Sequence, residues 1–260
     1  MTGTLSQLKS EPRPVGWGDD KLSEFFEAAR QQQFATFANF QWAFAILREI
    51  DSCMLRAVEN LNQPQDILGA ILMIRSHSAY RAACATVTAT QLPESFVLTR
   101  SSLEYAGYAL HIHMNRTLGE TWLRRHDDAA SMTAVRKAFQ AASIEKTIAD
   151  KDAKLGEIYK QLYQSTIDFG GHPNERGVST NLLQQDQAFL GIYLHANELA
   201  IANCFKSVAL TGLTCLNIFQ HIFEARFSLL GLKERLFALR TCEQQFIAWL
   251  QKWEISNKNA

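Results

Sequence analysis

Apolar residues recur at three- and four-residue steps from Leu22 onward, which is the period of an amphipathic α-helix. The first stretch of this pattern comprises Leu22, Phe25, Phe26, Ala29, Phe37, Phe40, Phe44, Leu47, Met54, Val58 and Leu61. It predicts a helix from about Asp20 to Leu61, with two acidic residues at its start, where the helix dipole favours negative charge. A straight helix of that length would span roughly 60 Å. We therefore expect a bend or a break inside it.

Prolines and capping residues divide the next part of the chain. Pro64 suits a first helical position and Asp66 would lie in the first turn, so a second helix is predicted from Pro64 to about Thr90. The segment Leu92-Pro93-Glu94 repeats this pattern and predicts a third helix that ends near Arg116. Thr117-x-x-Glu120 has the form of a capping box and predicts a short fourth helix.

The second half of the chain is also mainly helical in pattern. Helical periodicity continues over residues 127–169, a loop is expected over residues 170–174, and the alternation within residues 178–194 is typical of a small β-hairpin. Two further helices are predicted, one over residues 197–223 and one after a break at Gly231. The fold class is therefore all-α, a multi-helix bundle with a small β-hairpin. We expect residues 1–18 to form a flexible N-terminal arm and residues 19–260 to form a single helical domain.

Charge and cysteine content narrow the function classes. Lys plus Arg and Asp plus Glu number 26 each, so the formal net charge is zero, which argues against broad nucleic-acid binding along a phosphate backbone. The five cysteines are widely spaced and form no C-x-x-C pair, which indicates reduced thiols. The chain shows no secretory signal pattern, and its longest apolar run, residues 207–223, is too short and too polar for a membrane span. We expect a cytoplasmic protein with no membrane partner.

The predicted third helix carries a row of ionisable residues. Arg100, Glu104 and His111 lie at positions i, i+4 and i+11, with Gly107 at i+7, so they share one face of a helix that is otherwise mostly apolar. Charges in such a place must be paired or face a cleft. A glycine in a helix interior costs about 1 kcal/mol relative to alanine, which suggests a close approach at Gly107. The alternative is a solvated Arg100–Glu104 pair with His111 incidental.

The loop that follows Phe169 offers a second group of candidates. Gly170 and Gly171 permit a tight turn, and Pro173 fixes the chain just after His172. A histidine held in this way, with Asn174 beside it, is a candidate acid–base or ligand-binding group. The alternative is a polar surface loop without a function.

Several specific motifs are absent from the chain. It has no G-x-x-x-x-G-K-[ST] phosphate loop, no H-E-x-x-H, no E-x-x-H and no G-x-S-x-G sequence. Glu104, His111 and His172 have the right chemistry for metal ligands, but their spacing is not diagnostic. We expect no metal and no cofactor.

Two segments resemble a known group of proteins. Residues 100–106, RSSLEYA, are similar to the R-S-x-x-E-A helix of uncharacterised all-helical bacterial domains, which carry a polar turn with a histidine about seventy residues later, as residues 165–174 do here. Those domains belong to the HEPN-like group of helical bundles, which includes RNA-cleaving toxins and nucleotide-binding modules. The resemblance covers about residues 65–225, and it implies that Arg100, Glu104 and His172 meet across the bundle. The nucleolytic members use an R-x4-6-H motif, and no arginine of this chain has a histidine at that spacing.

These observations lead to three hypotheses. In the first, the protein is a binding module for an anionic ligand such as a nucleotide or a phosphate group, which Arg100 would hold with Glu104 orienting it and with Asn174 and His111 nearby. In the second, it is a metal-independent HEPN-like ribonuclease that uses His172 as general acid or base and Arg100 to stabilise phosphoryl charge. In the third, it is a structural or partner-binding homodimer built on the long first helix. The partners expected are therefore a nucleotide, RNA or a second copy of the chain.

Overall fold

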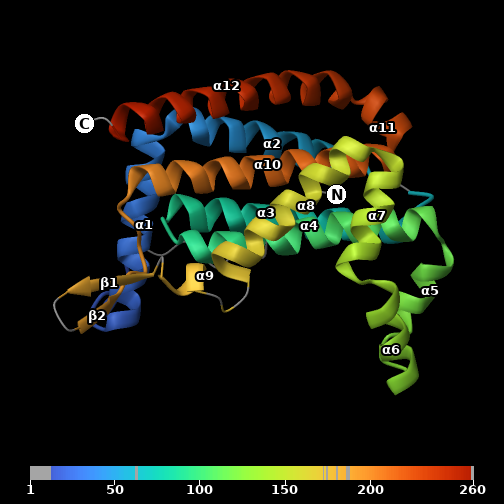
Figure 1. Cartoon of the computed structure of the whole chain (residues 1–260), viewed down its shortest axis with the longest axis horizontal. Helices are drawn as coiled ribbons and strands as arrows, with labels where there is room; N and C mark the ends of the chain where they lie inside the picture. The colour runs from blue at the N-terminus through green and yellow to red at the C-terminus, as the bar shows by residue number, and fades with distance from the viewer. Residues whose placement is uncertain are drawn as a thin grey trace.

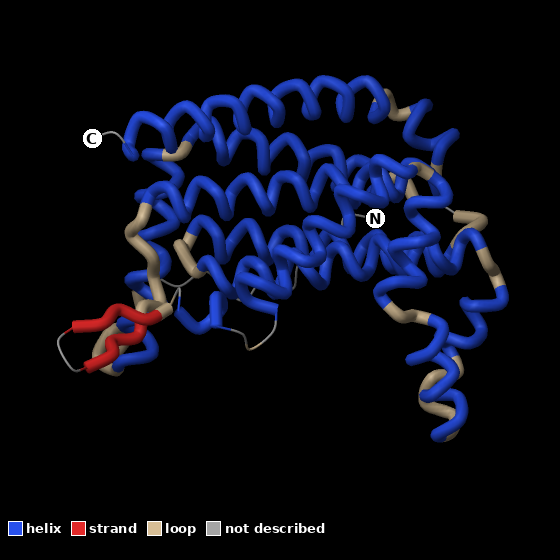
Figure 2. Tube along the Cα trace, in the orientation of Figure 1, coloured by secondary structure: helices blue, strands red, loops and turns tan. Residues whose placement is uncertain are grey.

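The computed structural model describes residues 13–61, 64–171, 173, 175–179, 181–185 and 188–258, and it shows an all-α helical bundle with one small hairpin. The long helices α2, α3, α4, α10 and α12 run along the same axis of the molecule (Figure 1 and Figure 2). In chain order the elements are α1 (Lys21–Asn39), α2 (Gln41–Glu59), α3 (Ile67–Thr88), α4 (Leu92–Met114), α5 (Thr117–Leu123), α6 (Ala129–Ala138), α7 (Ala141–Lys151), α8 (Ala153–Thr166), the π-helical turn η1 (Ile167–Gly171), α9 (Glu175–Ser179), β1 (Leu182–Gln185), β2 (Ala188–Gly191), α10 (Glu198–Ile222), α11 (Glu224–Leu229) and α12 (Leu232–Lys258).

The first long periodic segment is two helices, as its length predicted. The side chain of Asp20 caps α1 by accepting hydrogen bonds from the backbone N–H groups of Leu22 and Ser23. The break falls at Phe40, which is buried and stacks on Phe205 of α10 with a centroid distance of 5.9 Å. The chain turns there because this ring is drawn into the core, and α1 then crosses the end of the bundle (Figure 1).

The helical hairpin of α3 and α4 is tightly packed. The hydroxyl groups of Ser76 and Ser102 are fully buried, and each donates to the other residue's backbone carbonyl, at 2.9 and 3.0 Å. Small side chains at this crossing allow the two backbones to approach closely. Thr90, between the helices, has a φ of 59°, and Gln91 N–H donates to Thr86 O as in a Schellman helix end.

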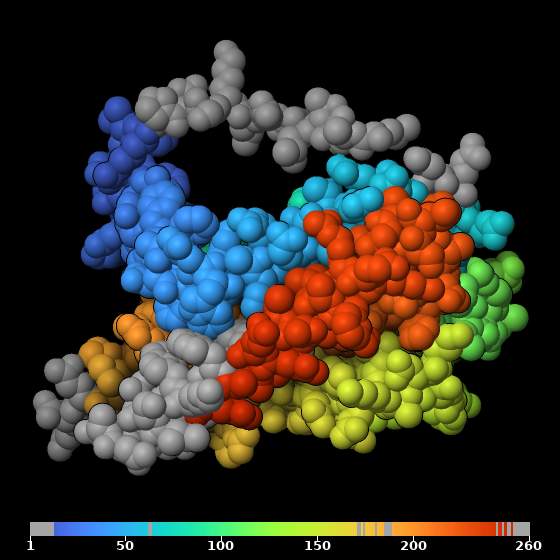
Figure 3. Space-filling view, turned by 90° about the horizontal axis from the view of Figure 1, so that it is seen from above, coloured from blue at the N-terminus to red at the C-terminus, as the bar shows by residue number. Residues whose placement is uncertain are grey.

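Helix α10 is the core of the bundle. It packs on α2, α3, α4, α8 and α12, and most of its side chains are buried. It is the one helix among the described residues that is long and apolar enough to cross a membrane, and 67% of its apolar window is buried inside the fold. Figure 3 shows α11 and α12, in orange to red, lying on one face between α2 in blue and the α7–α8 region in yellow.

The hairpin prediction is confirmed within narrower limits. Strands β1 and β2 pair antiparallel, with Leu182 opposite Gly191 and Gln185 opposite Ala188. Val178, which belonged to the alternating segment, lies in α9 instead. An alternation of only three residues does not distinguish a strand from one helical turn.

One predicted helix start and one predicted helix cap are wrong. Pro64 lies before the helix, because α3 begins at Ile67 and Asp66 is its cap, accepting from Gly69 N–H at 2.8 Å. The N-cap of α5 is Arg116, without a side-chain capping bond, so Thr117 and Glu120 do not form the predicted capping box. In the predicted arm, residues 1–12 lie outside the described part, and Arg13 donates to the carbonyl of Trp17.

Candidate functional site

The structure brings Arg100 and Glu104 together, with a partner that the sequence did not suggest. Arg100 Nε donates to Glu104 Oε1 at 2.9 Å, and Arg100 Nη2 donates to the hydroxyl of Tyr163 on α8 at 2.9 Å. The Tyr163 hydroxyl donates in turn to Glu104 Oε1 at 3.1 Å. The guanidinium lies 5.0 Å from the centre of the Tyr163 ring, at a distance typical of a cation–π contact.

This Arg100–Glu104–Tyr163 cluster is half-buried and satisfies its own charges. Burial raises the pKa of the Tyr163 phenol, and the adjacent Glu104 carboxylate raises it further, so the hydroxyl stays protonated and can donate. Arg100 and Glu104 keep 23% and 37% of their side-chain surfaces exposed. The arrangement fixes α8 against α4 and leaves the guanidinium already engaged.

Gly107 has the close neighbour that its helix position predicted. A Cβ added there would lie 2.6 Å from Ile144 Cγ2 of α7 and 2.9 Å from the Tyr159 hydroxyl of α8. The close approach is helix packing, and no ligand is needed to explain this glycine.

His111 lies two turns further along α4 and is bound to other groups. Its Nε2 is 3.2 Å from the carbonyl of Ala138, which can only accept, so Nε2 carries a proton. Its Nδ1 lies 2.7 Å from the Thr147 hydroxyl. Burial lowers the pKa of His111, which keeps the ring neutral at pH 7. Its described contacts belong to α7 and the end of α6, and none is to Arg100 or Glu104.

The predicted meeting of His172 with Arg100 stays a prediction, because His172 and Asn174 lie outside the described residues. The adjoining Gly170 is held against the start of α4. A Cβ added to Gly170 would lie 2.3 Å from the carbonyl oxygen of Pro93, so only glycine fits. Further along, Arg176 Nη1 lies 3.9 Å from Asp168 Oδ2.

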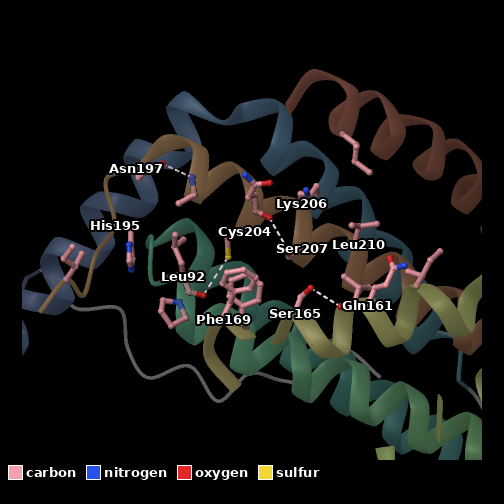
Figure 4. A pocket seen from close by; sticks show the side chains of 18 residues that line it. Leu92, Gln161, Ser165, Phe169, His195, Asn197, Cys204, Lys206, Ser207 and Leu210 are labelled. Atoms are coloured by element: carbon pink, nitrogen blue, oxygen red, sulfur yellow. Dashed lines mark hydrogen bonds between the residues drawn. The ribbon is translucent and has the colours of Figure 1, made fainter. Parts of the chain in front are cut away.

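A cavity of about 900 Å³ lies between α4, α8, η1, α10 and α12. Its size is within the range of small-molecule sites. In Figure 4, His195 and Asn197 lie at one end, Gln161 and Leu210 lie at the other, and Phe169 lies between them. The apolar part of the wall is formed by Leu92, Pro93, Phe96, Ile158, Leu162, Phe169, Ile192, Ala200, Cys204, Leu210 and Ile247.

Lys206 is the only lysine or arginine among the described residues that line this cavity. It is half-buried on α10, and no described residue forms a hydrogen bond or an ion pair with it. The sequence held a signal for it, since Lys206 is the only charged residue from Leu199 to Ile222. A single cation in a long apolar helix is unusual, because burying an unpaired charge is costly.

The strained turn before α4 positions one end of the cavity. His195 donates its backbone N–H to the carbonyl of Thr90 at 3.1 Å. Its ring Nε2 lies 3.0 Å from Asn181 Oδ1, an acceptor that places the proton on Nε2. Burial lowers the pKa of His195, so the imidazole is neutral at pH 7. Asn197 caps α10 by accepting from Ala200 N–H.

A second cavity of about 180 Å³ adjoins the first. Ile158 and Leu210 line both, and the second also contains Lys154, Arg240 and the buried Asn217, to which Arg240 donates a hydrogen bond. Its wall is more charged than that of the first.

The described lining offers little for metal or nucleophilic chemistry. Across the described residues, no group of three or more His, Cys, Asp or Glu side chains is placed to hold a metal ion. Burial raises the pKa of the Cys204 thiol to about 12, so the reactive thiolate is not formed at pH 7. The hydroxyls of Ser165 and Ser207 donate to carbonyls of their own helices, at 2.9 and 3.1 Å.

Comparison with known proteins identified no relative of this chain. No protein family model, curated protein or solved structure matches the chain.

Proposed function

We propose that the protein is a binding module for a small organic anion, which binds in the cavity between α4, α8 and α10 with its anionic group at Lys206. The observation that carries this proposal is a half-buried lysine in a mainly apolar wall, without a carboxylate partner among the described residues. An anion that reaches this amine meets no competing carboxylate on the described wall, and the apolar surroundings strengthen the attraction between the two charges.

The anion is assigned to Lys206 instead of Arg100 because their surroundings differ. Arg100 already donates to Glu104 and Tyr163, and it does not line the cavity. An anion at Arg100 would have to compete with a carboxylate that lies on the same helix. Lys206 has no such competitor in the described part of the fold.

Binding is favoured over catalysis by the state of the groups in the cavity. A nucleophilic enzyme needs a hydroxyl or thiol within hydrogen-bond reach of a base. Here the described serine hydroxyls are bound to helix carbonyls, the thiol of Cys204 is protonated, and neither is hydrogen-bonded to His195.

Thermal unfolding with a panel of sodium octanoate, AMP and inorganic phosphate tests the proposal. A ligand present at 100 times its Kd stabilises the fold by about 2.7 kcal/mol, which corresponds to a Tm rise of roughly 5–10 °C for a chain of this size. We expect at least one organic anion to produce such a rise, Lys206→Met to remove it, and Lys154→Met, in the neighbouring cavity, to retain it. No rise with any anion, or equal rises in both variants, would refute the proposal.

The ribonuclease alternative depends on two groups. His172 lies outside the described residues, and Arg100 is engaged by Glu104 and Tyr163. It is tested by incubating total RNA with the wild type and with His172→Ala. Degradation that the substitution abolishes would place this function first.

The homodimer alternative has one observation in its favour. Leu22, Phe26, Phe34 and Phe37 form an exposed apolar row on α1, with more than 45% of each residue exposed. Apolar rows of this kind are common at protein interfaces. Light scattering would report a dimer, and Phe26→Glu combined with Phe37→Glu would dissociate a dimer that uses this face.

A further inference from the structure

We infer that the ligand of the large cavity is a singly charged amphiphile, a straight-chain carboxylate whose head group binds Lys206 and whose chain lies along α10 toward Ile192. This inference rests on the proposed function and names the class of anion. Three features of the cavity carry it: the number of charges, the hydrogen bonds already used, and the length of the apolar wall.

The charge of the wall fits one negative charge. Lys206 is the single cationic group of the described lining, and His195 is neutral at pH 7 because burial lowers its pKa. A nucleoside diphosphate or triphosphate would bring several negative charges next to one cation and into an apolar cavity, where each uncompensated charge is strongly unfavourable. A carboxylate brings one.

The polar groups of the wall are mostly occupied by the protein itself. Ser165 and Ser207 donate to helix carbonyls, the side chain of Asn197 caps α10, and the ring of His195 bonds to Asn181. Recognition of a nucleobase or a sugar requires several convergent donors and acceptors. Most donors and acceptors of the described wall are already hydrogen-bonded within the protein. This favours a ligand with a hydrocarbon body over a nucleobase or a sugar.

On one side of Lys206 the cavity runs along the first turns of α10, where the polar side chains of Asn197 and His195 are already hydrogen-bonded within the protein. From Asn197 to Lys206 the helix advances nine residues, or about 13 Å. Leu92, Phe96 and Ile192 line the cavity along the same side. At about 1.2 Å per bond of an extended chain, this distance takes roughly ten carbon atoms. In the other direction the cavity adjoins, beyond Leu210 and Ile158, the charged second cavity, so the chain is expected to run toward Ile192.

Isothermal titration calorimetry with hexanoate, octanoate, decanoate and dodecanoate tests the inference. Each buried methylene is expected to lower Kd by about four-fold until the chain fills the wall near decanoate, after which Kd levels off. Lys206→Met is expected to raise the Kd of decanoate at least ten-fold and to leave the Kd of neutral octan-1-ol unchanged. Lys154→Met serves as the matched control and should bind decanoate like the wild type.

A second variant keeps the test independent of the folding of Lys206→Met. Ala200 lines the cavity between Asn197 and Lys206, so Ala200→Leu narrows the space for the chain. It is expected to move the plateau from decanoate to a shorter carboxylate while hexanoate binds as in the wild type. An unchanged plateau would overturn the assigned direction of the chain.

The outcomes separate this inference from the proposed function. If AMP or phosphate binds in a manner that requires Lys206 and the carboxylate series shows no dependence on chain length, the amphiphile is wrong and the anion-binding function stands. If no anion binds, both are wrong. If carboxylates bind equally well to the wild type and to Lys206→Met, the head group does not bind Lys206, and both assignments fail.

Discussion

Thr90 is the residue whose replacement tests the energetics of the fold most directly. Its φ of 59° is in the left-handed region, which costs an L-residue about 1–2 kcal/mol and costs glycine nothing. Its side chain is fully buried, and its hydroxyl finds no hydrogen-bond partner in the described part of the chain. Leaving a buried hydroxyl unpaired costs about 1–3 kcal/mol.

Two substitutions separate these contributions. Thr90→Ala removes the unpaired hydroxyl and also a buried methyl group worth about 1 kcal/mol, and it keeps the backbone strain. Thr90→Gly relieves the strain as well, at a cost of about 0.5–1 kcal/mol in the greater freedom of the unfolded chain. We expect the glycine variant to be more stable than the alanine variant by about 1 kcal/mol, or roughly 2–4 °C in Tm.

Urea unfolding followed by circular dichroism measures the difference, and Ala35→Gly supplies the control. Ala35 is exposed in the interior of α1, where glycine is expected to destabilise by about 1 kcal/mol. The sign of the Ala-to-Gly change should therefore invert between the two positions. A glycine at position 90 that is less stable than alanine would refute the argument that strain is stored in this turn.

Three further predictions concern other parts of the bundle. Gly107→Ala should destabilise by about 1–3 kcal/mol in urea unfolding, although alanine is the better helix former, because the added methyl overlaps side chains of α7 and α8; a stabilised variant would contradict the observed packing. Asp66→Asn should lower the free energy of unfolding by about 3 kcal/mol, because this buried carboxylate accepts from Gly69 N–H and pairs with His113 and Arg116. A loss within about 0.5 kcal/mol, which is typical of surface sites, would contradict that estimate. Burial lowers the pKa of His111, so stability should be lost as the pH falls below about 6.5, where the unfolded chain takes up the proton first. Urea titrations between about pH 7.5 and about pH 5.5 measure this loss, which His111→Gln should reduce.

The helices could be predicted because local patterns determine them. The three- and four-residue spacing of apolar side chains gave α1 to α4 and α10 nearly to their ends, and the expected break in the first segment is at Phe40. The start at Pro64 and the capping box at Thr117 were wrong because several residues near a helix end can serve as its cap. Which one does so depends on neighbours that are distant in sequence, as with Asp66 and its partner His113.

The spacing on α4 correctly predicted which residues share one face of the helix. It did not predict which residues cover that face. Arg100, Glu104 and Gly107 do share one face, as their positions required, and Gly107 does allow a close approach. The spacing could not show that the face is covered by Tyr163 and Tyr159, because these residues are about sixty positions away. A row of charges predicts that a partner exists and does not identify it.

The cavity was missed because its wall is assembled from five elements that no local pattern connects. Lys206 alone was visible in the sequence, as the single charge of a long apolar stretch. In a soluble bundle such a lysine has a neutralising partner from a distant helix or reaches water. Tertiary packing decides between these two cases. The surroundings of Lys206 are therefore known only once α4 and α8 are placed beside α10.

The strained turn and the large cavity meet at the start of α4. Helices α3 and α4 cross tightly at Ser76 and Ser102, and the chain passes from one to the other through Thr90, a single left-handed residue. That turn presents its carbonyl to the backbone N–H of His195 and so ties the segment that precedes α10 to the start of α4, beside the cavity. Protein interiors are close-packed, so a ligand that contacts this apolar wall would gain dispersion contacts with it. Those contacts are the physical reason to look for a ligand between α4, α8 and α10.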